Sequence, residues 1–456
     1  MQLKSIHLKH TGPFQDLNVE FDYAHKPITL ILGEQGVGKT TLLKHIFQAL
    51  SWFPARFKDS RTAGIVTLDQ DISFQKNQSK TAISVHFPAE LGVLSEASDV
   101  SNQDQTSCSW RLYKTLTASG TGFSQVETQQ LEQMVELYQH AIKQDPLQSL
   151  PVIAYYPADR FINEINLLSK NIPAVFQPSA AYDISTLPFT TFARFFEWLR
   201  EVSDIENAQA AQLLQQLAQQ NAIDNEQDVQ QLLFHAQAQL KTPHLQALKN
   251  SLQHIFPDLT DFYLEYHPKL QLMVCYQDQI IPYQQLSNSL KIWIALIGDL
   301  VRRLCLLNPL SLYPCLEGEG IILIDQIDTQ LDQMLSREIL IRLNQAFPQV
   351  QIIATGNRDE LLEHATAYQC YKLSHQGIAP IELGQPTELY DQIYSHLFDE
   401  TLSDTALISD LNTFTTEMFD QLLAQIEHLT EDQKAAIIRA IRPDSATEQD
   451  ASDHAR

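Results

Sequence analysis

The feature that most constrains this chain is a glycine-rich octapeptide between a strand-like segment and a helix-like segment. Residues 33–40 read Gly-Glu-Gln-Gly-Val-Gly-Lys-Thr and fit the pattern G-x-x-x-x-G-K-[ST]. Residues 27–32 are apolar and rich in β-branched side chains, and residues 41–47 have the apolar spacing of a helix. Backbone N–H groups and the helix N-terminus of such a unit face the phosphates of a nucleotide. The octapeptide therefore predicts an α/β fold that binds a nucleoside triphosphate.

Each part of this loop has an expected role. Lys39 is predicted to reach the β- and γ-phosphate oxygens, and Thr40 to hold Mg²⁺. The predicted nucleotide contacts of the loop are Gly33, Glu34, Gln35, Gly36, Val37, Gly38, Lys39, Thr40 and Thr41.

Composition limits the class of protein. A chain of 456 residues with 44% hydrophobic residues is long enough to bury a large core in two or three domains. We find no apolar run near 18 residues and no signal-peptide pattern, which predicts a cytoplasmic protein without a membrane segment. The five scattered cysteines are expected to be reduced core thiols. The net charge of −24 argues against a generally basic nucleic-acid surface and leaves a local basic groove open.

The pattern along the chain predicts four domains. Residues 1–160 form a first ATPase lobe, residues 161–256 a helical insertion, and residues 257–390 a second ATPase lobe. Residues 391–456 form acidic C-terminal helices and a tail, with fourteen Asp/Glu against four Lys/Arg and hence a net charge of −10.

Periodicity also predicts the individual elements. A hairpin is expected over residues 1–25, and further strands at 64–68, 82–87, 151–156, 262–266, 270–276, 320–324 and 350–355. Helices are expected from the capping-box signature Ser124/Glu127 to about residue 143, as several short helices within 189–256, and at 290–307, 331–347, 415–429 and 435–441. The strand–helix–strand order near 320–355 implies a parallel sheet.

A second acidic motif is expected to complete the nucleotide site. Residues 321–325 are an apolar strand that ends in Asp325, which is suited to the Mg²⁺ shell beside Thr40, although an ordinary strand-end turn is the alternative. Gln326 follows where a glutamate usually polarises the attacking water. An amide orients water but does not accept its proton, and loss of a general base costs about 10²–10⁴-fold in rate. A naturally slow or static site and an engineered replacement of glutamate both remain open.

Between these two motifs lies a signature-like segment. Residues 285–291 read Gln-Leu-Ser-Asn-Ser-Leu-Lys and resemble the L-S-G-G-Q-like signature of ABC-type ATPases. The resemblance implies that Ser287, with Asn288 and Ser289, binds the γ-phosphate held by the opposite subunit. A plain helix cap is the alternative for Ser287, and Ser289 stands where glycine is usual.

Three further positions complete the candidate site. Residues 329–332 resemble the D-loop of the same group and add Asp332 as a nucleotide contact. Asn357 stands where relatives carry a switch histidine, with a helix cap before residues 359–362 as the alternative. Gln70 is the candidate Q-loop ligand of Mg²⁺, with a surface turn as the alternative.

The order of these motifs resembles the ABC-type ATPase head of the SMC/RecF/OLD group, as does the first hairpin with Gly12-Pro13-Phe14. Within that group the chain is most similar to the AAA-type, PtuA-like ATPases of Septu and retron-associated anti-phage defence. The stretches that carry this likeness are Tyr155-Tyr156 with Arg160, Ala181-Tyr182 with residues 195–199, and Asp299-Leu300 with Arg302-Arg303 and Asn308-Pro309. Arg160 is interpreted either as a contact to phosphate or partner, or as an exposed structural arginine.

The resemblance implies a P-loop NTPase with an ABC/SMC-like head, a mixed β-sheet, a helical insertion and C-terminal helices. It further implies a head-to-head homodimer around two ATP molecules with Mg²⁺, larger homo-oligomers, and an effector nuclease as partner in anti-phage defence. The alternatives are a RecF-type DNA-repair ATPase, which would have DNA as a partner, and a non-hydrolysing scaffold locked by ATP.

Overall fold

The computed structural model describes residues 1–94, 106–117, 120, 122–145, 147–161, 178–182, 192–220 and 243–381. The chain divides into two compact units, Met1–Leu383 and Gly384–Arg456. The helices predicted at 415–429 and 435–441 fall in the second unit, outside the described residues. The three domains predicted before residue 390 fall almost entirely in the first unit, and their boundaries stay predictions.

A six-stranded mixed sheet lies at the centre of the first unit, in the order β14-β13-β3-β12-β11-β7. Its strands are β3 (Ile28–Leu32), β7 (Val152–Tyr156), β11 (Gly320–Ile324), β12 (Val350–Thr355), β13 (Tyr368–Ser374) and β14 (Gly377–Pro380). β14 is antiparallel to β13, and the other neighbours are parallel. All residues of β3, β11 and β12 are buried, as expected for a sheet covered on both faces. The predicted parallel arrangement is confirmed, whereas β13 and β14 were not predicted.

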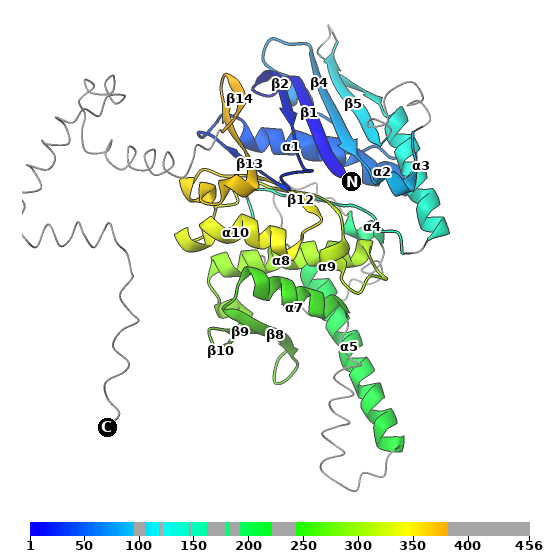
Figure 1. The fold of residues 1–456 in the computed structure, drawn as a ribbon, viewed down its shortest axis with the longest axis vertical. Coiled ribbons are helices and arrows are strands. Elements are labelled where there is room, and N and C mark those ends of the chain that lie inside the picture. Colours follow the sequence, from blue (N-terminus) through cyan, green and yellow to red (C-terminus); the bar gives the residue numbers. More distant parts are fainter. Residues whose placement is uncertain are drawn as a thin grey trace, which may run out of the picture. The chain divides into compact units, whose positions relative to one another are not determined.

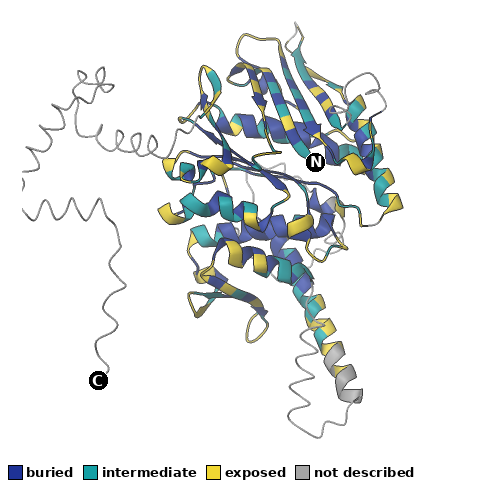
Figure 2. Cartoon of the chain, in the orientation of Figure 1, coloured by how far each residue is buried: buried dark blue, intermediate teal, exposed yellow. Residues whose placement is uncertain are grey.

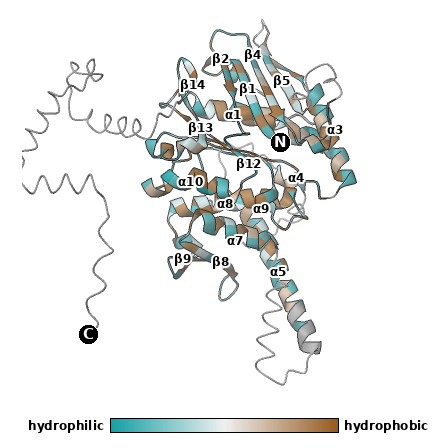
Figure 3. Ribbon diagram, viewed as in Figure 1, coloured by the Kyte–Doolittle hydropathy of each residue, from teal (hydrophilic) through white to brown (hydrophobic). Residues whose placement is uncertain are grey.

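A five-stranded antiparallel sheet, β2-β1-β4-β5-β6, lies on the other side of the first helix (Figure 1). Its strands are β1 (Gln2–Thr11), β2 (Phe14–Glu20), β4 (Gln78–His86), β5 (Ser107–Leu116) and β6 (Gly122–Glu127). Buried residues alternate with more exposed ones along β1 and β4, as Figure 2 shows. Figure 3 shows the hydropathy of the residues in the same view. Helix α1 (Lys39–Leu50) contacts both sheets, because Trp110 Nε1 donates to Ala49 O at 3.0 Å and the rings of Phe47 and Tyr155 lie 5.4 Å apart.

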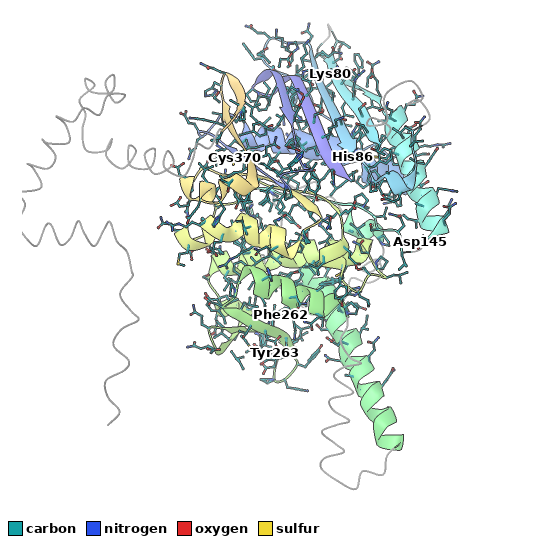
Figure 4. The ribbon with its side chains drawn as sticks, in the orientation of Figure 1. Lys80, His86, Asp145, Phe262, Tyr263 and Cys370 are labelled. Carbon is teal, nitrogen blue, oxygen red and sulfur yellow. The ribbon has the colours of Figure 1, made fainter. Side chains whose placement is uncertain are left out.

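The remaining elements surround these sheets. The other helices are α2 (Trp52–Lys58), α3 (Gln129–Gln144), α4 (Pro178–Ala181), α5 (Ala193–Gln220), α7 (Pro243–Ile255), α8 (Asn288–Leu307), α9 (Pro314–Glu317) and α10 (Gln333–Ala346). A third sheet orders β10 (Gln279–Pro282), β9 (Gln271–Tyr276) and β8 (Leu259–Glu265). Figure 4 labels Phe262 and Tyr263 on β8, where the alternating pleat leaves the first residue 5% and the second 39% exposed. Among the described residues, every helix is too short or too polar to cross a bilayer.

Two sequence predictions were wrong in detail. Residues 64–68 form no strand, because side chains bind their backbone: Ser51 Oγ accepts from Ile65 N, and Asp71 Oδ2 accepts from Leu68 N. Ser124 and Glu127 do not cap a helix but lie in β6, paired with β5, and α3 begins only after Thr128. The helices expected within 189–256 are present in the described part as α5, which with 28 residues is longer than expected, and α7.

The cysteines agree with their prediction. No disulfide joins them, and Cys108, Cys305, Cys315 and Cys370 are buried while Cys275 is half-buried; all five belong to the described ranges. Burial raises the pKa of the Cys108 thiol to about 12. These thiols therefore pack as small apolar groups.

A buried ionic cluster joins the segments that carried the family resemblance. Asp299 of α8 accepts from Tyr156 Oη at 3.1 Å, from Arg302 Nε at 3.1 Å and from Arg303 Nε at 2.7 Å. Arg302 and Arg303 also donate to the carbonyls of Ala180 and Ala181. Asp299 is 3% and Arg302 2% exposed. The cluster thus ties α4 and α8 to β7, an edge strand of the six-stranded sheet.

We predict that Asp299→Asn destabilises the fold by about 3–5 kcal/mol, because it leaves buried arginine charge without its partner. Burial raises the pKa of Asp299, but the two arginines together outweigh it and hold the pKa at about 2, against an ordinary value of 3.8. A depressed carboxyl pKa gives stability that is complete above about pH 4 and is lost as the pH falls towards 2. Urea denaturation at pH 7 and across the acid range measures both effects.

The matched control is Glu127→Gln, which breaks the exposed ion pair between Glu127 and Arg111. This pair is expected to contribute only about 0–1 kcal/mol. Equal losses in the two variants would contradict the structural role of the cluster.

Candidate nucleotide-binding site

The candidate site lies where the parallel strands end. Strands β3, β12, β11 and β7 are neighbours and run parallel, so the segments that follow them share one edge of the sheet. These segments begin at Gly33, Gly356, Asp325 and Pro157. Ligands of open parallel sheets bind at this edge. The fold therefore brings the phosphate loop and Asp325 to the same side, as the sequence predicted.

Glycines shape the phosphate loop. Gly33, Gly36 and Gly38 have φ angles of 156°, 82° and 102°, which side-chain-bearing residues rarely adopt. A Cβ at Gly33 would lie 2.3 Å from Leu373 O, and a Cβ at Gly38 would lie 2.7 Å from Phe14 Cζ. Glu34, Gln35 and Gly36 are exposed, whereas Val37 is buried beneath them. The loop therefore presents its backbone to solvent while α1 starts directly behind it.

Lys39 is held inside this loop. Its Nζ donates to Gly33 O and, at 2.8 Å, to Glu34 O, and the residue is only 7% exposed. Burial lowers the pKa of Lys39, and the charges of Asp325 and Asp328 oppose this shift. The ammonium group is thus placed between the loop carbonyls and the acids at the end of β11. Thr40 and Thr41, the next two residues, are exposed and half-buried respectively.

Asp325 is the centre of the site's acidic half. It is fully buried, and its Oδ1 accepts from Thr355 Oγ1 at 2.6 Å. Thr355 Oγ1 also accepts from Gln326 N at 2.8 Å, so one hydroxyl orients both residues. The sequence analysis missed Thr355, because a threonine at the end of a strand does not by itself reveal a partner 30 residues away.

The second carboxylate oxygen of Asp325 fits a metal site. Oδ2 is buried and has no hydrogen-bond partner within the described part of the chain. A buried, unpartnered carboxylate oxygen is costly unless a cation or water satisfies it. Carboxylate and hydroxyl oxygens are the ligands that Mg²⁺ prefers, so Asp325 and Thr40 are suited to hold it together with the substrate phosphates.

Arg160 binds the main chain at Asp325 and Gln326. Its Nη1 donates to Asp325 O at 2.7 Å and its Nη2 to Gln326 O at 3.0 Å. Arg160 is 4% exposed, and burial lowers its pKa to about 10, against which the charge of Asp325 acts. The interpretation of Arg160 as an exposed arginine was therefore wrong, and a contact to phosphate or to a partner stays a prediction. It is a buried positioning residue for the end of β11.

Gln326 lies in a constrained turn. Its φ of 45° is in the left-handed region, where a glutamine is uncommon. Arg160 and Thr355 bind its backbone, and its Oε1 accepts from Thr329 Oγ1 at 3.3 Å. The Gln326 amide therefore has a fixed orientation at the site, but it does not accept a proton.

Asp328 organises the loop after β12. Its Oδ2 accepts from Asn357 N at 2.8 Å and from Arg358 N at 2.9 Å. The Asn357 side chain is exposed, and the short helix at Asp359–Leu362 begins after Arg358 without a side-chain cap. The helix-cap alternative for Asn357 was therefore wrong, and a role towards phosphate stays a prediction. Asp328 itself escaped the sequence analysis.

The signature-like segment and the D-loop form a separate surface. Ser287 is the N-cap of α8, and its Oγ accepts from Leu290 N at 3.3 Å. Asp332 is the N-cap of α10, and its Oδ1 accepts from Leu335 N at 2.7 Å. Ser287 and Asn288 are exposed, and Ser289 is half-buried. Both caps line one groove of about 1030 Å³, which we call the signature groove.

Gln70 is exposed and lies beside the five-stranded sheet. It belongs to a short helix at Asp69–Asp71, whose acids pair with Lys114 at 2.9 Å and Lys44 at 3.1 Å. This agrees with the surface-turn alternative, and a role of Gln70 as a Mg²⁺ ligand stays a prediction.

Two known proteins match this chain over most of its length. The chain is 24% identical over 459 residues to the retron Vc95 probable ATPase of Vibrio cholerae serotype O1 biovar El Tor, covering 94% of this chain and 82% of the relative. It is 25% identical over 423 residues to the retron Ec83 probable ATPase of Escherichia coli, covering 84% and 72%. Among solved structures, an SMC head bound to the C-terminal winged-helix domain of ScpA matches with a TM-score of 0.43 and 11% identity, covering 86% and 100%.

The family assignment rests on the matching profile and agrees with the geometry. The profile of the AAA domain family matches residues 5–260, more than half of the chain and the part that contains the phosphate loop. The loop, the strand-end aspartate and the mixed sheet are those of a P-loop NTPase. The chain belongs to the AAA domain family of P-loop ATPases.

Proposed function

We propose that this chain is a cytoplasmic ATPase that pairs head to head around two ATP molecules and controls an effector nuclease in anti-phage defence. The observation that carries the nucleotide part is the free Asp325 Oδ2 at the sheet edge that also presents Lys39. The two retron relatives, both named as probable ATPases, support the defence context.

Binding would use residues of the loop and of β11. The backbone N–H groups from Gly36 to Thr40 face the phosphates, and Lys39 exchanges its loop carbonyls for phosphate oxygens. Asp325 and Thr40 would hold Mg²⁺, whose positive charge would offset the negative charge of the β- and γ-phosphates. The carboxylate is already oriented by Thr355, so little side-chain freedom is lost on binding.

The opposite half of each site would come from a second copy. Ser287 is exposed at the start of α8, where a hydroxyl and the helix N-terminus together attract an anion. A helix start on one chain and a phosphate loop on another then share one triphosphate. This pairing makes dimerisation dependent on nucleotide.

Gln326 favours a second candidate function. An amide in the place of a general base supports slow or absent turnover, in which ATP would act as structural glue for a static scaffold. The enzyme and the scaffold differ in whether an acid at this position restores hydrolysis.

We predict that Gln326→Glu raises kcat for ATP hydrolysis by about 10²–10⁴-fold, because a carboxylate at this fixed position accepts the proton of the attacking water. Phosphate release under saturating ATP and Mg²⁺ measures the rate. ATP affinity is expected to change little, because the phosphate contacts remain.

The matched control is Gln376→Glu, the same chemical change in an exposed turn. It is expected to leave the rate unchanged. If Gln326→Glu remains as slow as the original chain, the scaffold replaces the enzyme as the better account.

We predict that Lys39→Ala and Ser287→Ala each lower turnover by about 10²–10³-fold, because each removes a group that stabilises phosphate charge. Mixing the two variants is expected to restore part of the activity. In the mixed dimer one site carries both defects and the other site carries none, since Lys39 acts within its own chain and Ser287 across the interface.

The mixing experiment uses whichever form of the chain hydrolyses ATP, either the original chain with Gln326 or the Gln326→Glu variant. A mixture no more active than the single variants, although subunits exchange, would contradict sharing of the site between two copies.

A further inference from the structure

Two large apolar side chains are unusually exposed. Among the described residues, Phe74 at 87% and Met334 at 79% are the most exposed large hydrophobic residues. Such residues, when they lie beside a functional site, indicate a surface that is covered in a complex. Each of these two residues borders one half of the proposed composite site.

Phe74 is connected to the phosphate loop through its neighbour Ser73 and the β1–β2 turn. It belongs to a tip, residues 73–77, that the Ser73 side chain fixes by donating to Gly12 O at 2.8 Å and Phe14 O at 3.3 Å. Phe14 in turn packs against Gly38 of the phosphate loop. Gln75, the next residue of the tip, has a φ of 62° and turns the chain back. We call residues 73–77 the Phe74 tip.

Met334 stands at the signature groove. The apolar lining of this groove of about 1030 Å³ includes Tyr276, Ile281, Leu290, Trp293, Met334 and Leu335. Trp293 is 1% exposed, and its Nε1 has no hydrogen-bond partner within the described part of the chain. Gln330 Oε1, from a second lining residue, is likewise buried and without a described partner. One donor and one acceptor are therefore left for an occupant.

The charges of the two surfaces are complementary. Asp258, Asp332 and Glu338 line the groove, and Arg342, which also lines it, is paired with Glu338. The Phe74 tip carries Lys76, which is exposed. An apolar ring followed by a lysine thus matches an apolar groove with an acidic lining.

We propose that the Phe74 tip of one copy inserts into the signature groove of a second copy. This inference rests on the head-to-head pairing proposed above. In that pairing, Ser287 of one chain lies on the phosphate loop of the other. The signature groove beside Ser287 therefore meets the Phe74 tip of the chain that supplies the loop. Phe74 and Met334 bury each other, and main-chain groups of the tip satisfy Trp293 Nε1 and Gln330 Oε1.

Cross-linking between two different variants tests the contact. Phe74→Cys and Met334→Cys are made separately in a Cys275→Ser background, because the other native cysteines are buried. The two chains are mixed, given ATP and Mg²⁺, and treated with a short bis-maleimide. We expect a covalent dimer in the mixture with nucleotide, and none from either variant alone or without nucleotide.

Sedimentation of the same samples separates this inference from the proposed function. A nucleotide-dependent dimer that does not cross-link in the mixture, or that cross-links equally in the single variants, overturns the inference and leaves the pairing intact. Absence of any dimer overturns both.

The affinity of the dimer provides a second test of the contact between the Phe74 tip and the signature groove. Phe74→Ser is expected to raise the dimer Kd by at least about 10-fold, the loss expected for one buried aromatic side chain, without changing the ATP affinity of the monomer. Leu312→Ser is the matched control, because Leu312 is 68% exposed and lies outside the groove. Equal dimer Kd values for Phe74→Ser and the original chain would also overturn the inference.

Discussion

The site depends on one hydrogen bond, from Thr355 Oγ1 to Asp325 Oδ1 at 2.6 Å. This bond fixes the carboxylate in a fully buried position and leaves its other oxygen without a partner in the described chain. Because β11 and β12 are parallel neighbours, the register of the sheet alone places the two residues at the same level. Arg160 binds the main-chain carbonyls of Asp325 and Gln326, so both the side chain and the main chain of the acid are held before any ligand binds.

The sequence was sufficient for the parts of the site that short motifs encode. The strand–loop–helix around Gly33 and Lys39 and the apolar strand ending in Asp325 needed only local pattern, and both are confirmed. The positioning residues Thr355, Asp328 and Arg160 could not be assigned in this way. Their role arises from strands brought together over separations of up to 165 residues, as for Arg160 and Asp325. A lone arginine or threonine in a sequence carries no sign of such a partner.

Tertiary hydrogen bonds also account for the errors in the predicted secondary structure. Residues 64–68 have a strand-like composition, but side chains of Ser51 and Asp71 satisfy their backbone, so no neighbouring strand is needed. Ser124 and Glu127 have the spacing of a helix cap, but pairing with β5 prevails over that local preference. Local signals failed where tertiary hydrogen bonds decided the conformation.

The central claim is that Asp325 presents a free oxygen to Mg²⁺ bound with a triphosphate. Calorimetric titration of ATP with Mg²⁺ or with EDTA tests this most directly, in the original chain, in Asp325→Asn and in the exposed control Asp159→Asn. We predict that Mg²⁺ tightens ATP binding in the original chain and in Asp159→Asn, and has little effect in Asp325→Asn. Equal dependence on Mg²⁺ in all three proteins would contradict the account.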